Sequence, residues 1–393
     1  MEVFLVEGGL VCAVMTLAGV AAAHWRLALL PLLVAAGIAL GPHLPPLGLI
    51  DWHFTYSAPF LDVLGRLGLV SLVFSLGLEC VVGRLPPVRQ RLMAGSILYL
   101  ALQGSVALVY VSVGNWPWHA GLLVMGMLTL SSQAMLAYLV THLLSISAPA
   151  LAMLQGIRTC EARLGALYLT GVTIMLGSGA PAWQGLMTTA GVTLGGVLGG
   201  LLLRRYGLPW LNRTLHRPTD TTLVLVLCAG WCVAAGAAET LPAAVMGALG
   251  LGLVLAETDH RQRLARLARP WCAFLGAFYC FSFGLTIDPT VLPGTAGLAL
   301  GAVGCTLGGT VLASHLAGRV ARLASPAAWH IGLALGVRGE WALIFASLGT
   351  LAGHGPVLQP LAAVYVCMLA LLVPLLATMV HRSGIMCQGT AHT

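Results

Sequence analysis

The chain has 393 residues, of which 59% are hydrophobic and only 8% are charged, and its mean hydropathy is +0.94. Soluble domains carry about a quarter of their residues as charged side chains, so this composition excludes a soluble enzyme or binding module and indicates a polytopic membrane protein. All 19 basic residues are arginines and together they give a net charge of +7. We expect the lipid bilayer to be the partner of this chain, and no nucleic acid.

Thirteen apolar spans follow one another along the chain, and each is long enough to cross about 30 Å of hydrocarbon. Their centres lie near residues 13, 34, 71, 102, 128, 163, 193, 229, 248, 279, 305, 339 and 368. The first span begins at Val3 without a basic leader or a small-residue cleavage site. We therefore interpret it as a retained helix and not as a signal peptide.

Arginine is distributed unevenly among the loops. Fifteen loop arginines all follow odd-numbered spans, and the loops after even-numbered spans hold none. The positive-inside rule then predicts an N-terminus outside and a C-terminus in the cytoplasm. An odd number of spans also allows two repeats of opposite orientation within one transporter domain, 1–393. We place the repeats at 1–180 and 218–383, with a linker helix and loop at 181–217 and no soluble regulatory domain.

Span five contains the polar run Ser131, Ser132 and Gln133 within the segment LTLSSQAML. Such a run is typical of a broken helix that exposes backbone groups at the middle of the membrane. Alternatively, the two hydroxyls bond back to the preceding turn of an unbroken helix. The residues of this segment alone leave both interpretations open.

Span six contains one acidic residue, Glu161, in the segment RTCEARLG. Helical spacing puts Arg158 and Glu161 on one face, where an (i, i+3) ion pair is allowed. Arg163 points about 200° away from Glu161 and therefore needs a partner on another helix.

Span twelve carries two opposite charges, Arg338 and Glu340, on either side of Gly339. A charged side chain at the centre of a membrane helix costs roughly 2.5–3.5 kcal/mol, so these two residues are expected to face protein or a water-filled cavity. An intramembrane pair of this kind marks a functional segment.

No H-E-x-x-H or G-x-S-x-G arrangement occurs, and no repeated selectivity filter is visible. We therefore expect neither an enzyme, nor a channel, nor a cofactor or metal site. The ten cysteines form no C-x-x-C pair, and disulfides are not implied.

Six segments resemble, in order, those of the bacterial monovalent cation/proton antiporters, in particular the transmembrane part of Kef-type potassium/proton and related sodium/proton exchangers. They are LGPHLPPLGLI (Leu40 to Ile50), FSLGLE (Phe74 to Glu79), LTLSSQAML (Leu128 to Leu136), MGALGLGLVLAETDHR (Met246 to Arg261), FYCFSFGLTIDP (Phe278 to Pro289) and Arg338-Gly339-Glu340. The resemblance covers nearly the whole chain.

This resemblance implies an all-α fold of about 13 transmembrane helices, built as inverted repeats with two interrupted helices that cross near Ser131–Gln133 and Arg338–Glu340. Beside the crossing, members of this family place an acidic residue that binds either a proton or a cation, Na⁺ or K⁺. The resemblance further implies a homodimer in the bacterial inner membrane, in which a core domain moves against a dimer-forming domain.

The resemblance places the ion-binding pair at Cys160 and Glu161, although a shifted register would put Glu161 first and Ala162 at the proton-carrying position. Arg158, Arg163, Arg338 and Glu340 are then the charged residues of the core. Two features depart from the family. Span six has Glu where Asp is typical. Many members also carry a lysine in span eleven, but this chain has none, and counting back from Glu340 without gaps reaches Thr310 at that position. One of the three arginines could take the part of that lysine.

The five charges of the proposed centre, Arg158, Arg163 and Arg338 against Glu161 and Glu340, sum to +1, which is unfavourable for a cation site. Either one arginine points out of the cavity, with Glu79 or a backbone carbonyl as its partner, or the chain is a proton-coupled or uniport transporter of another small solute, such as an anion. A scaffold that has lost transport is a further alternative.

Overall fold

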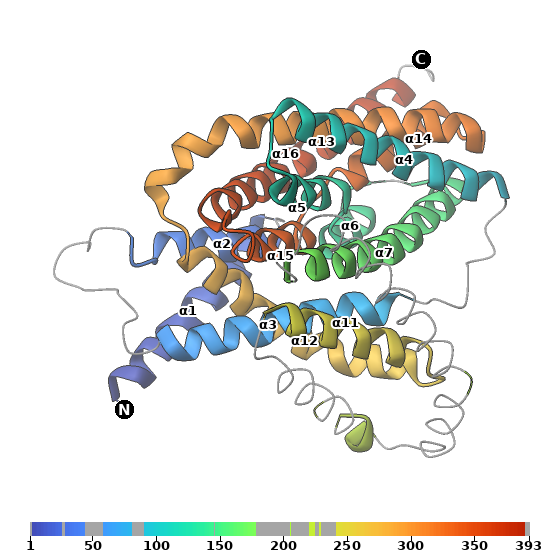
Figure 1. Ribbon diagram of the computed structural model, residues 1–393. Helices are drawn as coiled ribbons and strands as arrows, with labels where there is room; N and C mark the ends of the chain where they lie inside the picture. The colour runs from blue at the N-terminus through green and yellow to red at the C-terminus, as the bar shows by residue number, and fades with distance from the viewer. Residues whose placement is uncertain are drawn as a thin grey trace. The chain divides into compact units, whose positions relative to one another are not determined.

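A computed structural model describes residues 2–25, 28–43, 58–80, 90–144, 146–177, 205, 220–224, 228 and 241–389. The predicted spans near residues 193 and 229 lie outside these residues, as do loop residues 44–50 and, apart from Arg205, the predicted linker at 181–217. Within the described part, the chain forms thirteen α-helices of nine or more residues and one short 3-10 helix, and no strand (Figure 1).

The helices follow the predicted spans closely. In chain order they are α1 (Glu2–Trp25), α2 (Leu29–Ala39), α3 (Ala58–Glu79), α4 (Gln90–Val113), α5 (Trp118–Thr129), α6 (Gln133–His142), α7 (Ala148–Gly177), α11 (Leu241–Ala256), α12 (Arg261–Leu285), η2 (Pro289–Val291), α13 (Leu292–Ala321), α14 (Ser325–Leu335), α15 (Glu340–Leu348) and α16 (Gly355–Gly389). Of the thirteen predicted centres, ten fall within these helices, one falls at the break between α14 and α15, and two lie outside the described residues.

Several of these helices are long and apolar enough to span a membrane. Among the described residues, six helical segments meet this condition, and the bent α14–α15 pair makes a possible seventh. Because lipid offers no hydrogen bonds to the backbone, each apolar run forms a helix that satisfies its own N–H and C=O groups. The exceptions are the breaks within α5–α6 and α14–α15, where tertiary contacts must satisfy the backbone.

The described helices form two compact units, each assembled from separate stretches of sequence. The first unit comprises residues 1–57, 86–161 and 283–393. The second comprises residues 58–85 and 162–282, so that α7 and α12 each contribute to both units.

In the first unit, α13 packs along α4 and also against α14 and α16 (Figure 1). The hydroxyl groups of Thr306 on α13 and Tyr365 on α16 are both buried and lie 2.6 Å apart. Helices α5 and α15 pack on each other, and α15 also contacts α16. This packing holds the two interrupted helices inside the unit.

The two interrupted helices meet at their breaks. Helix α5 ends at Thr129 and α6 begins at Gln133, while α14 and α15 are bent by 42° across their own break. The backbone N–H of Ser132 donates to the carbonyl of Val337 at 3.1 Å. Of the two interpretations that the sequence left open for span five, the broken helix is therefore confirmed.

In the second unit, α3 packs along α11 with very close contact between backbones. A Cβ atom added to Gly252 would lie 2.3 Å from the Phe74 carbonyl oxygen and 2.9 Å from the Cα of Gly77. Small residues that allow such an approach are a common device of membrane helix packing. By contrast, a Cβ added to Gly250, two residues earlier in α11, would have no atom within 4 Å.

These two glycines give a matched test of the packing. We expect Gly252→Ala to destabilise the folded protein by about 1–3 kcal/mol, because the added methyl group overlaps backbone atoms that cannot move freely. Gly250→Ala should be neutral or stabilising, since alanine is the better helix former and has free space there. The melting temperature of each variant in detergent measures its stability, and equal melting temperatures for the two variants would refute the close contact.

Candidate functional site

Four helix ends converge where the breaks meet, all within the first unit. They are the C-terminal ends of α5 and α14 and the N-terminal ends of α6 and α15. A helix carries roughly half a negative charge at its C-terminal end and half a positive charge at its N-terminal end, and leaves unpaired carbonyl or N–H groups there. Inside a membrane protein these groups need partners from side chains.

Arg338 supplies the partners for the C-terminal ends. Its side chain is fully buried, and its Nε and Nη2 donate to the Leu128 carbonyl of α5 at 3.1 and 2.8 Å. Its Nη1 donates to the carbonyls of Val337, at 3.0 Å, and Leu335, the last residue of α14. One guanidinium group therefore binds carbonyl groups of both first half-helices.

Glu340 supplies the partners for the N-terminal end of α6. Its Oε2 accepts a hydrogen bond from the Ser132 hydroxyl at 2.6 Å, and its Oε1 accepts from the backbone N–H groups of Gln133 and Ala134 at 3.1 and 3.5 Å. Among the described residues no ion pair joins Glu340 to Arg338. The pair suggested by the sequence is thus not a pair, because each charge is held by helix ends.

Close approach at this point requires a small residue between the two charges. A Cβ added to Gly339 would lie 2.7 Å from the Ser132 Oγ. Gly339 thus leaves room for Ser132, the N-cap of α6, to reach Glu340.

Glu161 lies on α7 with only 5% of its surface exposed. The Ser131 hydroxyl donates to its Oε2, so that the break in α5–α6 contributes one serine to Glu161 and the next to Glu340. The other carboxylate oxygen, Oε1, is buried and has no hydrogen-bond partner among the described residues. One oxygen of this carboxylate is therefore held in place, and the other is free to bind a proton or an ion.

The ion pair that helical spacing allows between Arg158 and Glu161 does not form. The Arg158 Nη2 donates instead to the Gln133 side-chain oxygen at 2.7 Å, and no ion pair within the described residues involves either charge. Gln133 begins α6, so the amide draws the guanidinium group toward that helix. Arg158 and Arg338 still act on Glu161 through their electrostatic fields.

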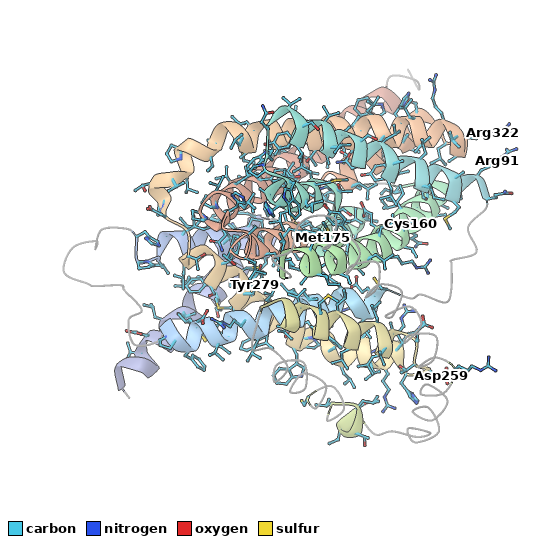
Figure 2. All side chains as sticks on the ribbon, viewed as in Figure 1. Arg91, Cys160, Met175, Asp259, Tyr279 and Arg322 are labelled. Carbon is cyan, nitrogen blue, oxygen red and sulfur yellow. The ribbon has the colours of Figure 1, made fainter. Side chains whose placement is uncertain are left out.

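The other predicted residues take different positions. The Cys160 thiol points to α4, where its sulfur lies 3.9 Å from that of Met93, and Figure 2 labels Cys160 on α7. Arg163 belongs to the second unit. Thr310, which stands where many family members have a lysine, donates its hydroxyl to the Leu307 carbonyl of its own helix.

Two residues of α4 join the site although the sequence did not single them out. The Gln103 side chain is fully buried and donates to the same Leu128 carbonyl as Arg338, at 3.1 Å, while its Oε1 has no partner among the described residues. The Tyr99 hydroxyl is likewise buried and within electrostatic reach of Glu161 and Arg338. A lone amide in the middle of an otherwise apolar span was the available signal for Gln103.

Comparison with known proteins assigns the chain to a family. The model of the family described as "Sodium/hydrogen exchanger, transmembrane" matches residues 10–382. The K(+)/H(+) antiporter subunit KhtU of Bacillus subtilis is 34% identical over 377 residues, which are 95% of this chain and 93% of KhtU. The putative cation/proton antiporter YbaL of Escherichia coli is 26% identical over 88% of this chain but only 62% of its own length.

A solved structure has the same fold. The sodium proton antiporter MjNhaP1 from Methanocaldococcus jannaschii aligns over 96% of this chain and 98% of its own, with a TM-score of 0.64 and 14% identity. The family model covers nearly all of the chain, and a relative covered almost in full is 34% identical, so this chain belongs to the sodium/hydrogen exchanger transmembrane family.

Proposed function

We propose that the chain is a secondary transporter that exchanges a monovalent cation for protons, and that Glu161 is the group for which the two compete. Potassium is the first candidate for the cation, because the 34% identical relative is a K(+)/H(+) antiporter subunit. Sodium is the second, because the matching family is that of the sodium/hydrogen exchangers and the aligned structure is a sodium proton antiporter.

The free oxygen of Glu161 is the observation that carries this proposal. A buried carboxylate with an unpaired oxygen is unfavourable as an anion, and it becomes neutral when it binds a proton or pairs with a monovalent cation. Either partner offsets the same buried charge, so binding of one displaces the other. Ser131 keeps the carboxylate oriented toward the break of α5–α6 in both states.

The arrangement of charges explains how a cation site can exist among three arginines. Arg338 carries one positive charge and faces two helix C-terminal ends of roughly half a negative charge each, while Glu340 faces two N-terminal ends of opposite sign. Both residues are therefore balanced by the backbone. Of the five charges of the proposed centre, Arg158 and Glu161 then remain in the first unit with a sum of zero, and a bound proton or monovalent cation neutralises the charge of Glu161.

The same arrangement argues against an anion bound at Arg338. An anion site would need a guanidinium group with free donors, but Arg338 uses its donors on three carbonyl groups. Arg158 donates to Gln133 through its Nη2 and keeps further N–H groups, so it is the group of this site to which an anion would have to bind. The Oε1 atoms of Glu161 and Gln103, which have no hydrogen-bond partner among the described residues, are both acceptors, and acceptors suit a cation or a proton.

We further propose the topology and assembly that the sequence predicts, with the N-terminus outside, the C-terminus in the cytoplasm, and a homodimer in the bacterial inner membrane. The exposed apolar side chains of α1 support the part of this proposal that concerns the membrane, since Val6, Leu17 and Val20 each expose more than 60% of their surface. Alternating access would move the unit that carries Glu161.

Replacement of the carboxylate tests the central role. Glu161→Gln should reduce cation-driven proton movement in everted vesicles to the level of vesicles without the protein, because the amide can neither take up a proton nor neutralise a cation. Glu161→Asp should retain measurable exchange. Asp62→Asn is the control, since Asp62 is an exposed carboxylate on α3, and wild-type exchange by Glu161→Gln would refute the proposal.

Substitutions of Glu340 test whether this carboxylate only stabilises the crossing of the interrupted helices. Glu340→Gln keeps an oxygen for the α6 N–H groups and should lower stability by about 1 kcal/mol while exchange continues. Glu340→Ala leaves those groups unpaired and should destabilise by about 1–3 kcal/mol. Thermal unfolding and vesicle exchange are measured together. A stable but inactive Glu340→Gln protein would assign ion binding to Glu340.

Arg338 tests the role of the guanidinium shape. Arg338→Lys keeps the charge but cannot reproduce a planar fork on three carbonyl groups, so we expect a clear loss of folded, monodisperse protein. Arg338→Ala should destabilise more, by about 1–3 kcal/mol for each buried carbonyl group that loses its donor. Arg319→Lys on the exposed end of α13 is the control. An unchanged melting temperature for Arg338→Lys would show that charge alone suffices.

A further inference from the structure

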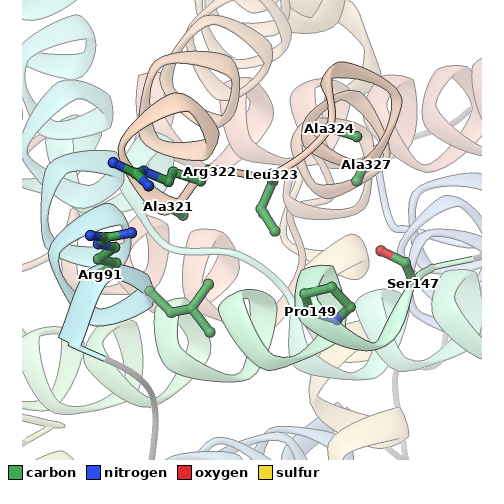
Figure 3. A pocket seen from close by; sticks show the side chains of 9 residues that line it. Arg91, Ser147, Pro149, Ala321, Arg322, Leu323, Ala324 and Ala327 are labelled. Atoms are coloured by element: carbon green, nitrogen blue, oxygen red, sulfur yellow. The ribbon is translucent and has the colours of Figure 1, made fainter.

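A second polar site lies in the first unit, away from the crossing. A cavity of about 290 Å³ opens between the start of α4, the start of α7, and the turn that joins α13 to α14. Two arginines, Arg91 and Arg322, line it together with Ser147 and apolar side chains. Figure 3 shows both arginine side chains on the same side of the cavity, and Figure 2 also places them together.

Two like charges in one cavity repel each other unless a negative group lies between them. Neither guanidinium group has a hydrogen-bond or ion-pair partner among the described residues, and no carboxylate lines the cavity. All of their donors are therefore available to a ligand. Arginine donors in this arrangement suit a phosphate group, which several N–H groups can bind at once.

The backbone conformation of Arg322 is unusual for an arginine. Arg322 has φ 57° and ψ 42°, the left-handed conformation, at the C-terminal end of α13. Its N–H donates to the Arg319 carbonyl and the Leu323 N–H to the Gly318 carbonyl, which together form a Schellman motif. Glycine is the usual residue at this position, so the helix end itself gives no reason for arginine there.

The end of α14 at the cavity has no side-chain cap. Ala324 is the N-cap of α14 and lines the cavity, and it has no side chain that could bind the first N–H groups of the helix. A negative group in the cavity would satisfy these N–H groups and interact favourably with the helix dipole. The two arginines and this helix end thus present positive charge to the same space.

Exposed apolar side chains on the helices that line the cavity indicate where the phosphate comes from. Val320, next to the lining residue Ala321, exposes 45% of its surface, and Trp329 on α14 exposes 48%. A tryptophan at such a position is typical of the membrane interface. Both arginines also follow odd-numbered spans in the sequence, so the topology proposed above puts them on one side of the membrane.

We propose that this cavity, which we call the Arg91–Arg322 site, binds the phosphate group of an anionic phospholipid in the adjacent leaflet. The headgroup phosphate lies between the two guanidinium groups and the start of α14, and the acyl chains lie along exposed apolar surface near Val320 and Trp329. This site is separate from ion exchange at Glu161 and does not depend on it.

Lipid binding by the purified full-length protein in neutral detergent tests the proposal. Phosphatidylglycerol should raise the melting temperature and remain bound in native mass spectrometry, whereas phosphatidylcholine should do neither. Arg322→Gly and Arg91→Gln should each lower the apparent affinity for phosphatidylglycerol about fivefold. Arg319→Gln is the matched control, because it removes one charge from the end of α13 but does not line the cavity, and it should bind lipid as the wild type does.

Arg322→Gly is the most informative variant, because glycine suits the left-handed backbone. Without lipid it should melt no lower than the wild type. A lower melting temperature would mean that protein contacts hold Arg322, and would overturn the proposal, as would equal losses in Arg319→Gln and Arg322→Gly. Inorganic phosphate at matched ionic strength distinguishes the sources: stabilisation by phosphate as strong as that by phosphatidylglycerol would overturn the lipid as ligand.

Discussion

Four helix ends inside a membrane protein are the constraint on which the centre of this chain depends. Carbonyl and N–H groups at those ends cannot bond to lipid, and each leaves part of a charge exposed. Arg338 and Glu340 satisfy both needs at once, because one binds the carbonyl groups of the first half-helices and the other binds the N–H groups of α6. The crossing is therefore held by bonds between side chains and the backbone.

This arrangement changes the charge balance of the site. Counted as side chains alone, the three arginines and two acids leave an excess of positive charge that would repel a cation. Counted together with the helix ends, Arg338 and Glu340 are each balanced by the backbone. Glu161 then remains as the buried carboxylate with an oxygen that has no partner among the described residues, and its surroundings favour neutralisation by a proton or a cation.

Adjacent serines link these two roles. Ser131 donates to Glu161 and Ser132 donates to Glu340, so the carboxylate that we propose to bind the ion and the one that braces the crossing are attached to neighbouring residues of one break. Any movement of α6 relative to α15 must therefore act on both carboxylates. The close approach of Gly339 to Ser132 leaves little room for independent movement at this point.

The sequence by itself determined the class of protein, the positions of the spans and the family. Hydropathy is a local property, and in lipid the backbone N–H and C=O groups must hydrogen-bond to each other within each span. Apolar runs of sufficient length therefore form helices. Sequence patterns also identified the polar run at Ser131–Gln133 and the charges of spans six and twelve. They could not choose between an interrupted helix and hydroxyls that bond to their own turn, because both are local possibilities for the same residues.

Only the tertiary structure decided the partners. Arg338 binds the Leu128 carbonyl, and because every residue has a backbone carbonyl, the sequence does not indicate which one is the acceptor. Arg158 donates to Gln133 on another segment and not to Glu161, its neighbour on the helix, so helical spacing alone did not give its partner. Arg91 and Arg322 line the same cavity although they are far apart in the chain. Hydrogen bonds and cavities depend on distances between segments, and those distances are set by packing, which no single stretch of sequence contains.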